Sequence, residues 1–391
     1  MSNFTIDAVR RLAGPDWLAE RRAAAFERFA EAPVPTEGDE IWRYSRVSQL
    51  QLDRLTPVDA TTTIAGADGL VSVTPPDVLV AVDPYFDELN EAFATPLVLR
   101  IPAGQTIASP IIIDHIVGDG QISFPRLVIV AGADSECTVI ERFTSADDAT
   151  AAIVPVLDLR VGPAARVRYL AINELGHSTA LIGHQRASGD RDSTTSLGTV
   201  SLGGSYARFR TDASADGAGA HTEQIALYFA DGDQMHDFRT IQHHIAPKTS
   251  ADLLFKGAVN DTAHSVYTGL IKIGPEARGT SAYQTNRNLT LSRGAWAESV
   301  PNLEIETNDV KCSHASTVGP LDADQVFYLE SRGVPPLQAQ RLILAGYFGE
   351  VFDRFNAPTE LVDELRARVA AKLARVSLHD APTNPAVEVT R

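Results

Sequence analysis

A long series of short strand-like segments, from about Thr95 to Thr317, limits what this chain can fold into more than any other feature. Each segment has about the length of one strand, many alternate in polarity with a period of two, and Gly, Asn, Asp or Ser residues separate them. The segments are PLVLRI, PIIIDHI, RLVIV, VLDLRV, ARVRYL, ARFRT, QIALYF, DLLFKG, VYTGLIKI, NLTLS and NLEIE. No long amphipathic helix pattern interrupts them. The series therefore excludes a βαβ sheet, which needs a crossover helix between its parallel strands.

So many consecutive strands leave a sandwich, a barrel or a solenoid as the possible architectures. Dipeptides typical of two-residue hairpins are few, and the clearest are Asp119-Gly120 and Asp231-Gly232. Short, evenly spaced strands favour a β-solenoid, in which each turn stacks on the next and free edges remain only at the two ends. A double-sheet jelly roll stays open as the alternative, because no strict short repeat is visible.

Helical patterns precede the strands. WLAERRAAAFERFAEA follows Pro15 and carries apolar residues at helical spacing, and EIWRYSRVSQLQLDRL is also expected to be mostly helical. From Thr56 to Pro84 the composition turns to Thr, Ala, Gly and Pro, which indicates a linker or irregular segment.

Three helices are expected after the strands. DADQVFYLESRG has Asp322 as a plausible N-cap and Gly333 at its end, and PPLQAQRLILAGYFGEVFDRF and PTELVDELRARVAAKLARV follow. The expected organisation is a helical region with a linker (1–94), a β core (95–317), a C-terminal helical domain (318–379) and a polar tail (380–391).

Charge and cysteine content exclude several classes of protein. The 391 residues include 34 Lys+Arg and 50 Asp+Glu, a net charge of −16, which disfavours binding to nucleic acids and to anionic membranes. The sequence contains no long apolar run that would span a membrane and no signal-peptide pattern. The two cysteines, Cys137 and Cys312, are too few for a disulfide framework or a zinc ribbon. We therefore expect a cytoplasmic protein in which Cys137 has a structural role.

Motifs of the common enzyme classes are absent from the sequence. It has no phosphate-binding P-loop, no dinucleotide-binding glycine motif, no G-x-S-x-G and no H-E-x-x-H. His243 and His244 are adjacent in an extended run, so they point to opposite faces of a strand. We expect one of them to be packed and hydrogen-bonded and the other to lie at the surface.

Cys312 and His314, in the run DVKCSH, are the more specific candidates. Two residues apart on a strand, they share one face, and a thiolate beside an imidazole suits iron or zinc. A protonated His314 would also lower the pKa of the thiol. Two ligands do not complete a metal site, so further ligands would have to come from elsewhere, most simply from a second chain. A buried structural cysteine beside an incidental histidine remains the alternative.

The region from His236 to Phe355 resembles the SufB/SufD family of iron–sulfur cluster assembly proteins. The matching segments are HHIAPKTSADLLFKGAVND, VYTGLIKI, AYQTNRNLTLS, PNLEIETNDVKCSHASTVGPLD and FYLESRG, together with EIWRYS near the N-terminus. Within the family the chain looks more like SufD proteins. SufB proteins carry a cysteine where this chain reads SRGAWAESV, and they tend to have a His-Glu pair at the positions of Cys312 and His314. Ala315, where Gly is usual, and His264, where Arg is common, depart from the family pattern.

The resemblance implies a right-handed parallel β-helix flanked by helical domains, as the strand pattern suggests. It also implies a non-catalytic scaffold that pairs with SufB and docks the ATPase SufC on its C-terminal helices, where the candidate docking residues are Phe327, Tyr328 and Arg332. Sulfur would come from a cysteine desulfurase system. A transient iron–sulfur cluster or iron would assemble at the SufB interface, where the resemblance puts Cys312 and His314.

The resemblance further implies a reduced flavin on the assembled complex, and the sequence locates no site for it. No cofactor is expected to bind tightly to the isolated chain, which we expect to form a homodimer when SufB is absent. Two other functions fit a β-rich chain less well. A β-helix protein that binds or cleaves polysaccharide would show a secretion signal and an aromatic groove. A cupin-like metal protein would need H-x-H with a following Glu, which QHHIAPKT lacks.

Overall fold

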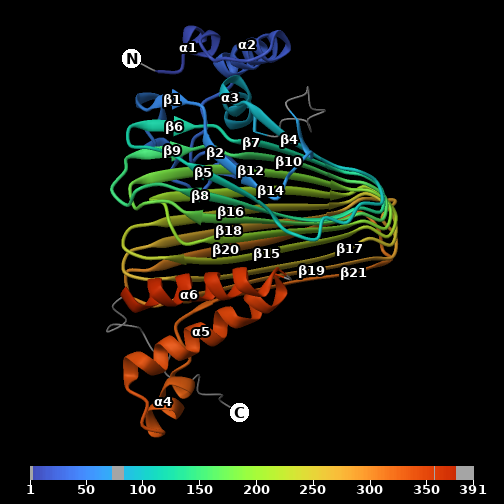
Figure 1. Ribbon diagram of the computed structural model, residues 1–391. Coiled ribbons are helices and arrows are strands. Elements are labelled where there is room, and N and C mark those ends of the chain that lie inside the picture. Colours follow the sequence, from blue (N-terminus) through green and yellow to red (C-terminus); the bar gives the residue numbers. More distant parts are fainter. Residues whose placement is uncertain (1–2, 73–82, 356, 376–391) are drawn as a thin grey trace.

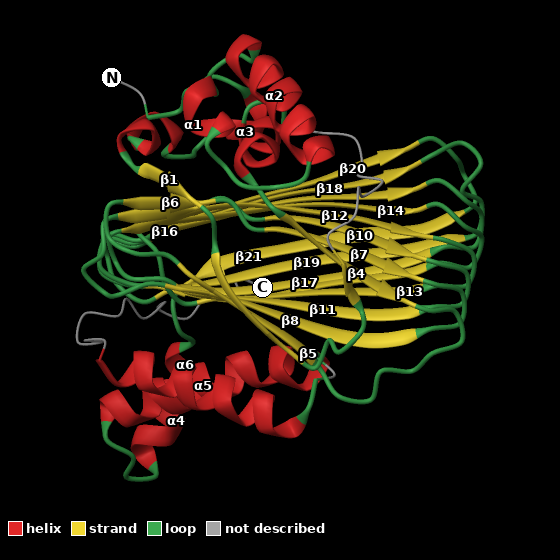
Figure 2. Cartoon of the chain, turned by 45° about the horizontal axis from the view of Figure 1, so that its top comes forward, coloured by secondary structure: helices red, strands yellow, loops and turns green. Residues whose placement is uncertain are grey.

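The computed structural model of the protein describes residues 3–72, 83–355 and 357–375 (Figure 1). Two stacked sheets form the centre of the molecule, and helices lie outside each sheet (Figure 2). The expected polar tail, 380–391, and the linker residues 73–82 lie outside the described residues.

The two sheets have twelve and nine strands. The twelve-stranded sheet contains β1 (Thr56–Val58), β3 (Val71–Ser72), β4 (Pro96–Ile101), β6 (Gln121–Ser123), β7 (Arg126–Ala131), β9 (Ala151–Ile153), β10 (Val156–Val161), β12 (Thr179–Gly189), β14 (Tyr206–Ala215), β16 (Met235–His244), β18 (His264–Ile273) and β20 (Trp296–Ile305). The nine-stranded sheet contains β2 (Thr61–Ala65), β5 (Ile111–Ile116), β8 (Glu136–Thr144), β11 (Arg166–Glu174), β13 (Thr194–Ser201), β15 (His221–Ala230), β17 (Ser250–Val259), β19 (Thr280–Thr290) and β21 (Val310–Gly319).

From β4 onward the chain runs from one sheet to the other and back, and each strand pairs in parallel with the equivalent strand of the next turn. This is a β-solenoid of about eight turns, and no helix interrupts it within the described residues. The β-solenoid prediction is confirmed, and the parallel pairing rules out the jelly roll. Asp119-Gly120 and Asp231-Gly232 are not hairpins, because each connects the nine-stranded sheet to the twelve-stranded sheet at a corner.

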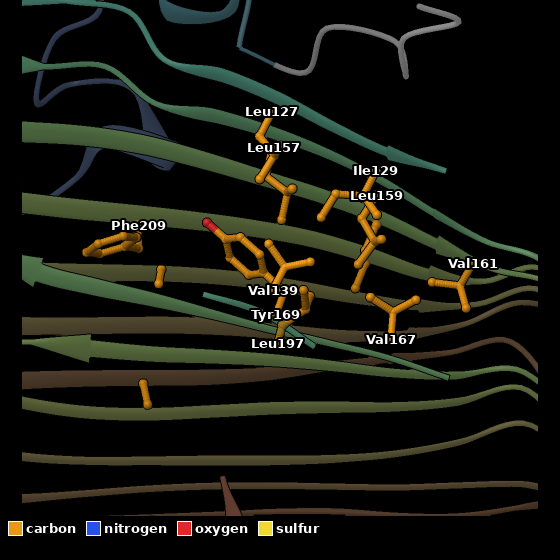
Figure 3. Packing of buried hydrophobic residues seen from close by; sticks show 14 of the residues in the cluster. Leu127, Ile129, Val139, Leu157, Leu159, Val161, Val167, Tyr169, Leu197 and Phe209 are labelled. Carbon is orange, nitrogen blue, oxygen red and sulfur yellow. The ribbon is translucent and has the colours of Figure 1, made fainter. Parts of the chain in front are cut away.

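The main core lies between the two sheets. Alternate residues of each strand point inward, and apolar side chains from both sheets meet there (Figure 3). Val139 and Tyr169 enter from the nine-stranded sheet, and Leu127 and Leu157 enter from the twelve-stranded sheet. At the corners, backbone N–H groups donate to carbonyls of the next turn; for example, Ala164 donates to Arg191. The turns thereby stack in register.

The two ends of the solenoid differ. At the first turn, β2 pairs antiparallel with β5 and β3 pairs antiparallel with β4, while β1 pairs in parallel with β6. At the last turn, β20 and β21 have no further strand beside them among the described residues. The last turn therefore has an exposed cross-section.

The N-terminal helices cover the outer face of the twelve-stranded sheet. They are α1 (Ile6–Arg10), α2 (Asp16–Glu31) and α3 (Phe86–Phe93), and their apolar residues pack on the outward residues of β6, β9, β12, β14, β16 and β18.

Two expectations for this region are wrong. Residues 40–55 form only three short 3₁₀ turns, Glu40–Trp42, Val47–Gln49 and Leu52–Arg54. The Arg208 guanidinium lies 3.8 Å from the Trp42 ring centre, and the carbonyls of Ile41 and Arg43 accept hydrogen bonds from Arg208 and Arg239, so contacts with the sheet outweigh helix formation. The supposed linker contributes β1, β2 and β3 to the sheets.

Of the three C-terminal helices, the second and third cover the outer face of the nine-stranded sheet, and the first packs against the second. They are α4 (Ala323–Ser331), α5 (Pro336–Arg354) and α6 (Thr359–Arg375), as expected. Asp322 caps α4 through Asp324 N–H and Gln325 N–H, and Gly333 adopts a positive φ of 87° after it. Leu361, Leu365, Val369 and Leu373 form the buried stripe of α6. None of the helices in the described ranges combines the length and the apolar character needed to cross a bilayer.

Candidate functional site at the open end of the solenoid

Cys312 and His314 lie on β21, the last strand of the nine-stranded sheet. Their register partners on β19 are Ala282 and Gln284, which belong to the inward-facing column and are almost fully buried. Cys312 and His314 therefore continue this column, and they share one face as the sequence predicted. Because no described strand follows β21, His314 is exposed and Cys312 is half-buried against the core.

Strand β20 provides the opposite side of the last turn. The Ser316 hydroxyl donates to the Ser299 hydroxyl across the two sheets at 2.7 Å, which fixes the alignment of the layer. Gly269 faces the Gln284 amide in the turn below, so their register partners Pro301 and His314 lie across from each other. Two residues away on each strand, Leu303 and Cys312 both pack against the core between the sheets. Sequence reasoning missed these β20 residues, since the order of the strands in space does not follow from the local pattern.

We call the inward residues of β20 and β21 the end layer. It continues the column that is buried in earlier turns, but here Ile305 and Val318 are 43% and 44% exposed. Repeat proteins normally cover the apolar side of a terminal repeat. The end layer therefore has the character of a surface that another structure covers.

The thiol of Cys312 is less acidic than the sequence suggested. Burial raises its pKa above the ordinary value, whereas a neighbouring cation was expected to lower it. Cys137 is fully buried in the core, and burial raises its pKa to about 12. The two free thiols thus differ strongly in access to solvent.

This difference predicts that iodoacetamide modifies only one thiol of the native chain, Cys312, because a reagent cannot reach a thiol closed off by the core. Peptide mass mapping after timed labelling would measure it. Modification of Cys137 at a similar rate in the native protein would contradict the placement of both side chains, and labelling after denaturation provides the control for both sites.

His243 and His244 behave as predicted and do not form a site. His244 is fully buried, with Nδ1 2.8 Å from the Thr249 hydroxyl, and burial lowers its pKa to about 4. His243 is only partly buried on the opposite face of β16. A single metal ion cannot bind both, which removes the basis of the cupin-like alternative.

No group of three or more His, Cys, Asp or Glu side chains in the described parts of the chain is arranged to hold a metal ion. Cys312 and His314 remain a pair of potential ligands, one sulfur and one ring nitrogen.

A second exposed surface lies on α4, away from the sheets (Figure 1). Phe327 is 70% exposed and Tyr328 is 56% exposed, and the Arg332 guanidinium stacks on the Tyr328 ring at 5.0 Å. Leu342 of α5, which the apolar pattern of this helix grouped with buried residues such as Phe348, is 50% exposed. We call Phe327, Tyr328 and Arg332 the α4 surface. Aromatic and arginine side chains of this kind are enriched at protein interfaces.

Comparison with known proteins identifies the family to which the chain belongs. The core domain of the SufBD proteins of the SUF system for FeS cluster assembly matches residues 115–347. A SufBD family iron–sulfur cluster assembly protein of Mycobacterium tuberculosis is 31% identical over 374 residues, covering 87% of this chain and 88% of that protein. The iron–sulfur cluster assembly protein SufD of Escherichia coli is 29% identical over 299 residues, covering 74% and 69%. SufD of Bacillus subtilis is 29% identical over 259 residues, covering 65% and 59%. The chain therefore belongs to the SufBD family of iron–sulfur cluster assembly proteins.

Proposed function

We propose that this chain is the SufD-type scaffold subunit of a cytoplasmic SufBCD complex, in which the end layer pairs with SufB and presents Cys312 and His314 to the assembling cluster. The observation that carries the proposal is the open last turn. Within the described residues no strand covers β20 and β21, so a potential sulfur ligand and a potential nitrogen ligand lie at an open end, whereas antiparallel strands lie at the other end.

The end layer suits a protein partner for two reasons. Its apolar residues, including Ile305 and Val318, lose contact with water when a second surface covers them. The free edges of β20 and β21 also offer backbone N–H and C=O groups that an added strand can pair. When SufB is absent, a second copy of this chain would use the same surface to form the homodimer.

The chemistry of the pair fits iron and sulfide as cargo. Iron–sulfur clusters are held mainly by thiolates, and histidine ligation also occurs. Cys312 and His314 would supply part of the coordination shell, and SufB would supply the rest. The raised thiol pKa means that metal binding, rather than solvent, would drive loss of the Cys312 proton.

The C-terminal helices would connect this end to the ATPase. The α4 surface offers exposed aromatic side chains for SufC, and α5 packs directly on the nine-stranded sheet. Association of SufC subunits would then bias the interface at the end layer between closed and open states, and the open state would admit iron or sulfide.

The test of the site is the substitution His314→Ala in a complex reconstituted with SufB and SufC. We expect anaerobic cluster assembly to fall at least about tenfold, since one ligand of the site is removed. His177→Ala, which removes an exposed histidine far from the end layer, provides the control. If His314→Ala assembles clusters as fast as the wild type, the site assignment is wrong.

The test of the ATPase surface is Phe327→Glu. A charge in the middle of an apolar contact is expected to weaken SufC binding by about 2 kcal/mol or more, the loss typical of a central interface residue. Val34→Glu is the matched control, because Val34 is 68% exposed and Phe327 is 70% exposed. Titration of SufC by calorimetry measures both variants, and equal affinities would remove the α4 surface from the docking site.

A further inference from the structure

Gln284 is the residue directly beneath His314 in the solenoid. The two are register partners on the neighbouring strands β19 and β21, and their side chains share the inward face. On the opposite sheet, Gly269 of β18 is likewise the register partner of Pro301. Gln284 and Gly269 therefore form the floor under the part of the end layer that contains His314 and Pro301.

The amide of Gln284 is buried without a partner. Gln284 is 1% exposed, and neither its Oε1 nor its Nε2 has a hydrogen-bond partner among the described residues. An unsatisfied buried polar group costs about 1–3 kcal/mol, so an apolar side chain would stabilise the chain better at this position. This cost indicates that the amide has a hydrogen-bond partner that the isolated chain does not provide.

The surroundings of Gln284 make room for this amide. A Cβ atom added at Gly269 would overlap Nε2 of Gln284 and would lie 2.7 Å from the Tyr267 hydroxyl. The Tyr267 hydroxyl is itself close to Thr240 Oγ1, at 3.2 Å. A polar floor at this level contrasts with the apolar residues at the same register in earlier turns, such as Val139 and Leu197.

We infer that Gln284 is a positioning residue for the Cys312/His314 site: its amide oxygen accepts a hydrogen bond from one ring N–H of His314 and leaves the other ring nitrogen free for iron. Strands in a sheet are about 4.8 Å apart, so a glutamine reaches a side chain on the next strand. Histidine ligands of metals are commonly held by such a hydrogen bond, which fixes the tautomer and the orientation of the ring. The inference rests on the proposed function of the end layer.

Titration of the SufB-containing complex with Co²⁺, a spectroscopic substitute for iron, tests it. The substitution Gln284→Leu is expected to weaken Co²⁺ binding by about 10–100-fold, the usual loss for a residue that orients a ligand. It is also expected to change the ligand-field absorption of the bound Co²⁺. Gln284→Glu keeps an acceptor oxygen and is expected to retain most of the affinity. Gly269→Ala, whose new Cβ displaces the amide, is expected to reproduce the loss without changing Gln284.

Gln224→Leu is the matched control. Gln224 lies in the same inward column two turns behind Gln284, is also 1% exposed and also has an unpartnered Oε1, but Leu253 separates it from the site. Wild-type Co²⁺ affinity and spectrum in both Gln284→Leu and Gly269→Ala would overturn the inference. Equal losses in Gln284→Leu and Gln224→Leu would also overturn it, because they would show a general effect of the core.

His314→Ala distinguishes a failure of the inference about Gln284 from a failure of the proposed Cys312/His314 site. If His314→Ala loses Co²⁺ and Gln284→Leu does not, only the inference about Gln284 fails. If His314→Ala binds Co²⁺ like the wild type, the proposed site itself is wrong. Should Gln284→Leu prevent folding, Gly269→Ala and Gln284→Glu decide the question.

Discussion

Replacing Asp237 with alanine is expected to destabilise the protein by about 3–5 kcal/mol, because it leaves two buried arginines without their shared carboxylate. Asp237 is fully buried on the outer face of β16, beneath the N-terminal region. Its carboxylate lies 2.5 Å from Arg208 Nη1 and 2.7 Å from Arg239 Nε, and it accepts a hydrogen bond from the Tyr206 hydroxyl at 2.9 Å. The same arginines hold the backbone of residues 41–43, so the variant is expected to loosen that segment as well.

Urea-induced unfolding of the wild type and the variant measures this effect. Asp353→Ala is the control, since its carboxylate, 73% exposed, pairs with Arg366 at the surface and is expected to contribute less than about 1 kcal/mol. Similar losses of stability in the two variants would contradict the role assigned to the buried cluster.

The contribution of Asp237 also predicts a pH dependence. Burial alone would raise the pKa of this carboxyl, but Arg208 and Arg239 lower it below the ordinary value. Because the folded pKa lies below the unfolded pKa, the stabilisation is complete above about pH 4 and is lost as the pH falls through the folded pKa. The stabilities of the wild type and of Asp237→Ala are therefore expected to converge in acid.

Replacing Phe348 with alanine is expected to cost about 3–5 kcal/mol and to loosen the C-terminal helices from the nine-stranded sheet. Phe348 of α5 is fully buried in the cluster that joins these helices to the sheet. Next to it, the Tyr347 hydroxyl donates to the Arg287 carbonyl at 2.6 Å, and Lys256 pairs with Glu350 at 2.5 Å. In the complex that we propose, this contact would connect SufC at the α4 surface to the end layer.

Leu342→Ala, on the same helix but 50% exposed, is the matched control and is expected to change stability by less than about 0.5 kcal/mol. Urea unfolding measures both variants, and calorimetry with SufC checks that binding at α4 persists. Equal stability of the two variants would show that α5 is not anchored through Phe348.

The sequence predicted the strands well, because inward and outward residues alternate and because the early turns are rich in Val, Ile and Leu. It did not reveal the repeat, since the length of a turn varies: register partners are 26 residues apart from Ala180 to Tyr206 but 32 apart from His264 to Trp296. Residues 40–55 carry a helical pattern, and tertiary contacts with Arg208 and Arg239 explain why they form short turns.

For the site, the spacing of Cys312 and His314 was sufficient to predict that they share a face. It could not show that this face continues the core, that β21 is the last strand, or that Leu303 and Pro301 lie opposite. These facts depend on which strands stack in space. The raised pKa of Cys312 was missed for the same reason, because burial against the core, rather than a nearby charge, determines it.

In the complex that we propose, SufB covers the end layer, and the rate of alkylation of Cys312 measures this coverage. Iodoacetamide labelling would be followed in the isolated chain at a concentration too low for self-association and again in the complex with SufB, with buried Cys137 as the internal reference. We expect complex formation to lower the labelling rate of Cys312 at least about tenfold, because pairing of β20 and β21 with the partner excludes solvent from the end layer. An unchanged labelling rate in a fully formed complex would contradict it.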